Sequence, residues 1–171
     1  FRYELNRGNS QDLHPLLTET ESKVIRADAC VRAAEQLKKK GFEPDLICAH
    51  PGWGEPLFLK SVWPDAPLLC YQEFYYNSHG FDTNFDDEFE GAKGWQEFAR
   101  FMMKNVYLNL ALEQSDWNVS PTHFQASSFP EHWRRRISVI HDGVDTRKAA
   151  PNPAPPPLRP PDGTVLEKGQ E

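Results

Sequence analysis

The chain has little of what membrane-spanning, secreted and disulfide-rich proteins need. Its 171 residues contain no run of eighteen apolar residues and no charged-then-apolar leader, so we expect neither a membrane span nor a secretory signal. The expected compartment is the cytoplasm. The chain has only three cysteines, Cys30, Cys48 and Cys70. Their odd number and apolar surroundings predict buried, reduced thiols rather than disulfides or a metal cage.

Long clusters of basic side chains are also missing. Nineteen Lys and Arg against 25 Asp and Glu give a net charge of −6, and the longest basic runs are 38–40 and 134–136. A protein that binds nucleic acid must neutralise many phosphates at once. We therefore expect no nucleic-acid partner.

Several catalytic motifs are absent. The chain has no G-x-S-x-G elbow, no G-x-x-x-x-G-K-[ST] loop, no G-x-G-x-x-G turn and no paired-histidine metal motif. The acidic stretch 82–88 begins like a calcium loop, but Asp87 stands where that loop needs glycine and Lys93 where it needs a bidentate Glu. We expect neither a metal nor a redox cofactor.

What the chain does contain is an alternation of helical and strand patterns. Apolar residues at helical spacing predict a long helix that starts at Thr18 and ends before Gly41, and another from about Gly94 to Gln114. A shorter helix is predicted with Pro56 in its first turn, and helical turns are predicted near Pro121 and Arg134. The apolar side of the helix at 94–114 is predicted to comprise Trp95, Phe98, Met102, Val106 and Leu110.

Four apolar runs predict short strands, at 46–49, 68–71, 117–119 and 137–140, and the alternating segment 1–5 predicts an edge strand. Strands without alternation that are separated by helices indicate a parallel sheet covered on both faces. The predicted fold class is therefore α/β, with a doubly wound parallel sheet whose ligands bind at the carboxyl ends of the strands.

The first strand-end loop has the sequence HPGWGE and starts at His50. Gly52 and Gly54 let the backbone approach a ligand closely, and the following helix offers free N–H groups. His50 is a candidate proton-handling group at the strand tip. The structural alternative is a tight strand-to-helix turn, with Glu55 as a cap and Trp53 as a lid.

The second loop places one carboxylate among aromatic rings. Glu73 follows Tyr71 and is itself followed by Phe74, Tyr75 and Tyr76. Rings that stack on a sugar and a carboxylate that accepts its hydroxyls are typical of carbohydrate sites. The alternative is a hydrophobic corner.

Taken together, these segments have a recognisable order between about residues 40 and 146. They are PDLICAHPGWGE from Pro44, FLK from Phe58, WPDA from Trp63, Tyr71 with EFYY from Glu73, VSPT from Val119 and ISVIHDGVD from Ile137. The combination resembles the amino-terminal domain of family 4 glycosyltransferases, in the bacterial branch linked to polysaccharide assembly.

The resemblance implies a GT-B architecture, in which two Rossmann-like domains face each other across a cleft. The first domain would hold much of the acceptor site, and the second most of the nucleotide-sugar site. Members of the family retain the anomeric configuration and usually need no metal. The implied partners are a nucleotide-sugar donor and a glycan or lipid-linked acceptor, with peripheral association of a longer parent at the inner face of the membrane.

The resemblance also implies roles for individual residues. His50 corresponds to the strand-end histidine that commonly faces the donor sugar, and Glu73 to the polar residue at the next strand tip. Ser120 corresponds to a strand-to-helix turn that faces the cleft. The remaining candidate substrate-binding residues are Gly52, Trp53, Gly54, Glu55 and Tyr75.

Both ends of the chain depart from the family pattern. The family domain opens with a strand and a glycine-rich loop, whereas this chain starts at Phe1, and seven of its fifteen prolines lie between Pro151 and Pro161. We expect 1–146 to be the amino-terminal domain truncated at its start, 147–161 an interdomain hinge and 162–171 the start of an absent carboxy-terminal domain. Such a fragment would be inactive alone.

Two alternative functions remain open from the sequence. One is an α/β-hydrolase in which HPGWGE is an oxyanion loop, although the missing nucleophile elbow counts against it. The other is a non-catalytic α/β module that binds carbohydrate.

Overall fold

The computed structural model describes residues 2–81, 83, 86, 88, 94–152 and 154–167. The chain divides into two compact units, Phe1–His141 and Asp142–Glu171. Most of the acidic stretch 82–88, which was compared above with a calcium loop, lies outside the described residues. None of the described helices combines the length and the hydropathy needed to span a bilayer.

The first unit contains a four-stranded parallel sheet. Its strands are β1 (Ile47–Ala49), β2 (Leu68–Tyr71), β3 (Trp117–Ser120) and β4 (Ile137–Val139), and they are ordered β1-β2-β3-β4. The predicted α/β class with parallel strands is confirmed, and the four strands predicted from apolar runs each form to within one residue at either end.

Helices connect the strands. The helix α1 (Thr18–Lys39) precedes β1, and α2 (Trp95–Gln114) lies between β2 and β3, while α3 (His123–Ser127) and α4 (Glu131–Arg134) link β3 to β4. The remaining helical turns are 3₁₀ helices, η1 (Pro15–Leu17), η2 (Pro51–Trp53) and η3 (Glu55–Ser61). The helix predicted with Pro56 in its first turn is thus a short 3₁₀ helix, and α1 ends as predicted, with Gly41 at a φ of 83°.

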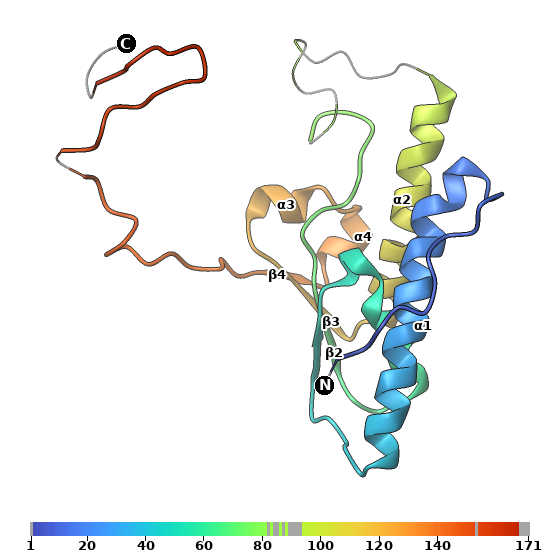
Figure 1. Ribbon diagram of the computed structural model, residues 1–171. Helices are drawn as coiled ribbons and strands as arrows, with labels where there is room; N and C mark the ends of the chain where they lie inside the picture. Colours follow the sequence, from blue (N-terminus) through green and yellow to red (C-terminus); the bar gives the residue numbers. More distant parts are fainter. Residues whose placement is uncertain are drawn as a thin grey trace. The chain divides into compact units, whose positions relative to one another are not determined.

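The strand order puts the crossovers on one side of the sheet. Parallel strands joined by right-handed crossovers that always step in the same direction have all their connections on the same face. The crossover helix α2 and the helix α1, which precedes β1, lie on the same side of the strands (Figure 1). The side chains of Leu68, Cys70 and Asn118 on this covered face are buried. The four described strands therefore step across the sheet in one direction, without the reversal of order that defines the switch point of a doubly wound sheet.

The other face of the sheet, termed the open face, is not buried as the sequence predicted. Side chains alternate between the two faces of a strand, so the residues that flank the buried ones in register point to the open face. Leu46 is 50% exposed, Trp117 46% and Ile140 58%. The open face consists of Leu46, Cys48, Leu69, Tyr71, Trp117, Val119, Ser138 and Ile140, all exposed or half-exposed.

The core lies between the covered face and the helices. One cluster joins α1, η3, β1 and β2 through residues such as Leu59, Trp63 and Leu68. A second joins α1, η3 and α2 around Leu57 and Leu108. Each fully buried apolar side chain of this size contributes about 1.5–3 kcal/mol of transfer free energy, so these clusters fix the position of β1 and β2 beneath the helices.

The predicted apolar side of α2 is wrong. Trp95 is 70% exposed, and the other four residues of that side are also exposed, whereas Phe101, Tyr107 and Leu108 are buried. The buried side includes Asn105, whose amide accepts a hydrogen bond from Tyr76 N at 3.0 Å and donates one to Tyr76 O at 2.8 Å. Because Asn105 is polar, the spacing of apolar residues in the sequence does not reveal that its side of α2 is the buried one.

The predicted edge strand at 1–5 does not form: its described residues, 2–5, are irregular. The residues that follow it, 7–10, are hydrogen-bonded to α1. Arg7 pairs with Glu21 at 2.8 Å, Ser10 N donates to Glu21 Oε2 at 2.8 Å, and Asn9 donates to Thr18 O at 2.7 Å. The prediction of three buried thiols is correct for Cys70 alone, because Cys30 is half-buried and Cys48 is exposed.

The second unit contains a small turn structure. Leu158 and Leu166 form an isolated antiparallel bridge, closed by a turn in which Gly163 has a φ of 84° and Thr164 N donates to Asp162 Oδ1 at 2.9 Å. That backbone hydrogen bond holds the pKa of Asp162 below its usual value.

Candidate functional site

His50 stands directly after β1 and has both ring nitrogens engaged. Gly52 N donates to His50 Nδ1 at 3.1 Å, and His50 Nε2 lies 3.2 Å from Glu73 Oε2. Because Nδ1 is an acceptor, the proton of the neutral ring is on Nε2, which therefore donates to the carboxylate. The pair is accessible, with His50 34% and Glu73 61% exposed at the side chain.

The loop sequence explains the position of this ring. His50 caps η2, and a Cβ at Gly52 would lie 2.6 Å from His50 Cε1, so only glycine leaves room for the imidazole over the turn. The ring also stacks on Tyr71, with centroids 5.8 Å apart and planes at 30°. Because β1 and β2 are adjacent and parallel, their carboxyl ends bring His50 and Glu73 together.

A recess of about 50 Å³ lies between these groups. That volume holds one or two water molecules. The recess is lined by His50, Pro51, Gly52, Tyr71, Gln72, Glu73, Phe74, Tyr76, Tyr107 and Leu108. The structure thus gathers His50, Gly52 and Glu73 among the predicted site residues.

Sequence reasoning missed Gln72. Its side chain is fully buried and donates to Asn118 Oδ1 at 2.9 Å. Within the described part of the chain, Gln72 Oε1, Asn118 Nδ2 and Ser120 Oγ have no hydrogen-bond partner. Buried polar atoms without partners are uncommon. A polar residue directly after an apolar strand was the available signal for Gln72, but its pairing with Asn118 depends on the register of β2 and β3.

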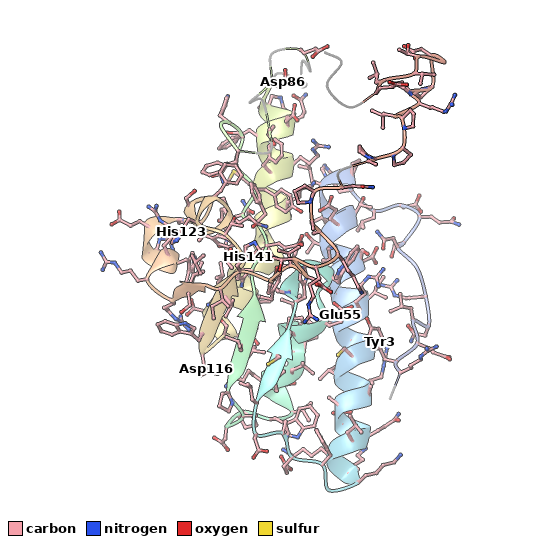
Figure 2. The ribbon with its side chains drawn as sticks, turned by 90° about the vertical axis from the view of Figure 1, so that its left-hand side faces the viewer. Tyr3, Glu55, Asp86, Asp116, His123 and His141 are labelled. Atoms are coloured by element: carbon pink, nitrogen blue, oxygen red, sulfur yellow. The ribbon has the colours of Figure 1, made fainter. Side chains whose placement is uncertain are left out.

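The rest of the HPGWGE loop turns toward α1 rather than toward the recess. Lys23 Nζ lies 5.0 Å from the centroid of the exposed Trp53 ring. Tyr3 donates from its hydroxyl to Glu55 Oε1 at 2.5 Å, and Figure 2 shows these two side chains together beside α1. Gly54 has a φ of 99°, and a Cβ there would lie 2.5 Å from Lys23 O. Gly54 therefore allows the loop to contact α1 closely.

Tyr75 and Ser120 lie apart from His50. The Tyr75 hydroxyl donates to Asn109 Oδ1 at 3.1 Å, and its ring packs on Phe129 with centroids 5.5 Å apart. Ser120 is fully buried on the covered face. Neither residue lines the recess.

A comparison with models of protein families matches residues 1–149 to the glycosyl transferase family 4 group. The match covers the whole sheet and both strand-end loops. The chain belongs to this family. We found no match among curated proteins.

Membership of the glycosyltransferase family 4 group implies that the domain binds a sugar donor and an acceptor. The geometry of the HPGWGE loop argues against the alternative that the chain is an α/β-hydrolase. An oxyanion loop needs free backbone N–H groups, whereas Gly52 N in this glycosyltransferase domain donates to the ring of His50.

Proposed function

We propose that this glycosyltransferase domain is the acceptor-side half of a retaining enzyme that transfers a hexose from a nucleotide sugar to a glycan or lipid-linked acceptor. The observation that carries the proposal is the hydrogen bond between His50 and Glu73, at the carboxyl ends of adjacent strands of a family 4 domain. In an open α/β sheet, ligands bind at the carboxyl ends of the strands.

The pair offers complementary groups to a sugar hydroxyl. The Nε2–H of His50 can donate a hydrogen bond, and the carboxylate of Glu73 can accept one. A hydroxyl inserted between them would replace their mutual contact, which is 3.2 Å long and accessible to solvent. We assign His50 to the reacting sugar and Glu73 to its orientation.

Aromatic rings beside the pair extend the surface that a sugar could contact. Tyr71, Phe74 and Tyr76 line the same recess. The C–H faces of a sugar pack favourably on such rings, while its hydroxyls bond to nearby carboxylates. This arrangement supports a carbohydrate ligand over an extended apolar one.

Transfer needs a second domain in this proposal. The nucleotide diphosphate would be held by that domain, with 147–161 as the hinge and 162–171 as its first residues. The chain alone would then be inactive. A cytoplasmic location, peripheral association of a longer parent with the membrane and a role in bacterial polysaccharide assembly are parts of the same proposal.

The role of His50 can be tested by two substitutions in the polypeptide translated from the complete reading frame. His50→Asn keeps a side-chain acceptor for Gly52 N but loses the Nε2 donor, whereas His50→Ala loses both. We expect each variant to fold and to lower kcat/KM by about 100-fold or more, measured as nucleotide release from a panel of nucleotide sugars.

An active His50→Asn variant would instead assign His50 to capping of η2. If the unmodified polypeptide shows sugar binding by calorimetry but no transfer to any acceptor in the panel, the non-catalytic carbohydrate-binding module becomes the better assignment. The exposed Glu73 among aromatic rings is the observation that favours this second candidate. Robust transfer by the 171-residue chain alone would contradict the two-domain proposal.

A further inference from the structure

Glu73 lies on a segment without regular structure. Residues 72–77 follow β2 and form neither helix nor strand. The side chain of Glu73 is 61% exposed, and its carboxylate is hydrogen-bonded to His50 at 3.2 Å. One exposed partner holds a solvated carboxylate only weakly. The position of Glu73 beside His50 therefore depends on the contacts that fix the backbone around it.

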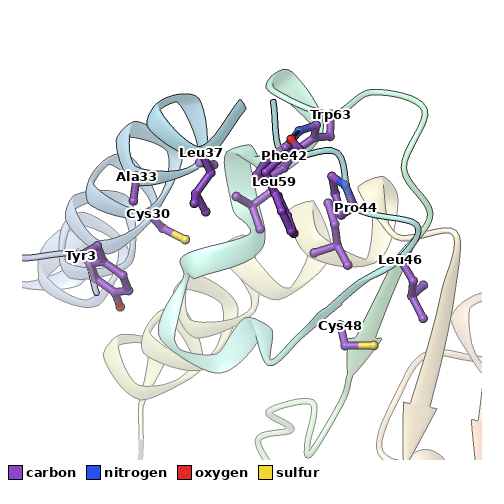
Figure 3. Close-up of a pocket in the computed structure, with 12 residues that line it drawn as sticks. Tyr3, Cys30, Ala33, Leu37, Phe42, Pro44, Leu46, Cys48, Leu59 and Trp63 are labelled. Atoms are coloured by element: carbon purple, nitrogen blue, oxygen red, sulfur yellow. Dashed lines mark hydrogen bonds between the residues drawn. The ribbon is translucent and has the colours of Figure 1, made fainter. Parts of the chain in front are cut away.

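A groove of about 340 Å³ between α1, η3 and β1 does not supply these contacts (Figure 3). It is lined by Tyr3 and by residues between Cys30 and Trp63, so none of residues 72–77 borders it. The contacts that hold the segment come instead from β3, α2 and α3.

The sheet fixes the start of the segment. Gln72 N donates to Val119 O at 2.7 Å, which extends the pairing of β2 with β3 by one residue. The buried side chain of Gln72 also donates to Asn118 Oδ1 at 2.9 Å. The residue directly before Glu73 is thus held through both its backbone and its side chain.

Asn105 fixes the other end of the segment. This residue of α2 is 6% exposed. Its Oδ1 accepts from Tyr76 N at 3.0 Å, and its Nδ2 donates to Tyr76 O at 2.8 Å. A hydrogen-bonded pair in an antiparallel sheet engages both backbone groups of a residue in the same way. The side chain of Asn105 therefore gives Tyr76 the partners that a neighbouring strand would give it.

Contacts from α3 support the same end. Tyr75 N donates at 2.9 Å to Oγ of Ser128, the C-cap residue of α3. Asn77 Nδ2 donates to Ser128 O at 2.9 Å and to Tyr75 O at 2.8 Å. The stretch that contains Glu73 is thus short and is held at both ends.

An amide at position 105 has costs that an apolar residue would not have. Its neighbours on the buried side of α2 include Phe101, Leu108 and Leu112. A buried amide is unfavourable unless its donor and acceptor are both bonded, and Asn is a weaker helix former than Leu. The chain nevertheless has Asn105 here, and both of its hydrogen bonds go to the segment that carries Glu73.

We propose that Asn105 is a positioning residue for the candidate site: it holds residues 73–76 in one conformation and thereby keeps the Glu73 carboxylate against His50. Its contribution to transfer rests on the function proposed above for His50 and Glu73. A segment that is ordered before a sugar arrives loses little conformational entropy on binding. The strand pairs do not involve residue 105, so loss of its hydrogen bonds releases Glu73 without disrupting the sheet.

The first test uses the 171-residue chain and needs no activity. Asn105→Leu removes both hydrogen bonds at similar volume, and Glu73→Ala gives the signal of a broken contact with His50. The control is Leu112→Ala, which destabilises the same helix at a fully buried residue that does not line the recess. The readouts are the NMR resonances of the His50 ring nitrogens and the hydrogen exchange of the Tyr76 amide.

In Asn105→Leu we expect the His50 resonances to move toward those of Glu73→Ala, and the Tyr76 amide to exchange about tenfold faster or more. Leu112→Ala should leave the His50 resonances in place. If the resonances of Asn105→Leu match those of the unmodified chain, Asn105 only stabilises the fold and the proposal is wrong. If Asn105→Leu does not fold, Asn105→Ala, which leaves space for water beside Tyr76, replaces it with the same expectation.

The second test asks whether Asn105 acts on transfer through Glu73. In the polypeptide translated from the complete reading frame, we expect Asn105→Ala to lower kcat/KM by about tenfold, measured as nucleotide release from a panel of nucleotide sugars. In a Glu73→Ala background the same substitution should have no further effect, because the group that it positions is already gone.

Independent losses in the double variant would contradict the proposal. If Glu73→Ala alone leaves kcat/KM unchanged, the proposed function of Glu73 fails, and the His50 resonances still decide the role of Asn105. The proposed function and the positioning role can therefore fail separately.

Discussion

Asp116 connects the amino ends of β2 and β3 through a single carboxylate. Asp116 Oδ2 accepts from Lys60 Nζ at 2.8 Å and from Leu68 N at 2.7 Å. Asp116 lies beyond the amino end of the strands, at the opposite end of the sheet from His50, and Figure 2 labels it there. The hydrogen bond from Lys60, followed by that from Leu68, holds the pKa of Asp116 below its usual value.

The lowered pKa of Asp116 gives a pH-dependent contribution to stability. A carboxyl whose pKa is lower in the folded state stabilises the fold above its unfolded pKa of about 3.9, and the contribution is lost as pH falls through the folded value. We expect Asp116→Ala to lower the free energy of unfolding by about 1 kcal/mol at pH 7, a modest value because the side chain is 55% exposed.

Urea denaturation of both proteins at pH 7 and at about pH 2.5 checks this linkage. The difference in free energy of unfolding between the unmodified chain and Asp116→Ala should be smaller at the lower pH. A difference that stays constant with pH would mean that packing, and not the ionised carboxylate, accounts for the effect.

At the scale of elements, the contact between the HPGWGE loop and α1 depends on one glycine. Gly54 has a left-handed backbone and no room for a Cβ beside Lys23, whereas Gly41 has a φ of 83° with open space around it. Substitution of Gly41 therefore measures the cost of backbone strain alone, whereas substitution of Gly54 measures strain together with steric overlap.

We predict that Gly54→Ala destabilises the chain by about 2–4 kcal/mol and Gly41→Ala by about 1 kcal/mol. The first value combines backbone strain with a clash against helix backbone that cannot move aside, and the second contains strain alone. Thermal unfolding followed by circular dichroism measures both variants. Equal losses would show that the close approach to Lys23 adds nothing.

The helix α2 shows where sequence patterning fails. One set of apolar residues at helical spacing is Trp95, Phe98, Met102, Val106 and Leu110, and the second is Phe101, Tyr107, Leu108, Ala111 and Leu112. Each set has five members, so a count of apolar residues does not separate them. The second set is the buried one, because Asn105 satisfies both backbone groups of Tyr76 and so belongs in the interior. A tertiary hydrogen bond of this kind cannot be predicted from spacing.

Two truncations on α2 test which side carries the packing energy. Leu108→Ala removes a side chain that is 3% exposed, and Met102→Ala removes one that is 58% exposed. We expect Leu108→Ala to lower the free energy of unfolding by about 2–4 kcal/mol and Met102→Ala to lower it by less than about 0.5 kcal/mol. Urea denaturation measures both. A larger destabilisation by Met102→Ala than by Leu108→Ala would mean that the side of α2 predicted from the sequence is the packed one.

At the scale of the whole molecule, the parallel sheet and part of the site could be predicted from the sequence. Continuous apolar runs bounded by Pro and Asp identify the strands, and the rule that adjacent parallel strands end together brings His50 near Glu73. The buried pair of Gln72 and Asn118 could not be predicted, because it depends on the register between two strands separated by α2. The uncovered face escaped prediction because strand order is not encoded in local patterns.

The strand order also has a consequence for synthesis. Because β1 to β4 pair in chain order, each strand finds its only earlier neighbour already in place as it leaves the ribosome. The sheet can therefore grow one strand at a time in the direction of translation, and no strand must wait for a partner that has yet to be made. Of the four strands described, β4 is made last, so a nascent chain interrupted before it already contains the three strands β1, β2 and β3, which are adjacent in the sheet.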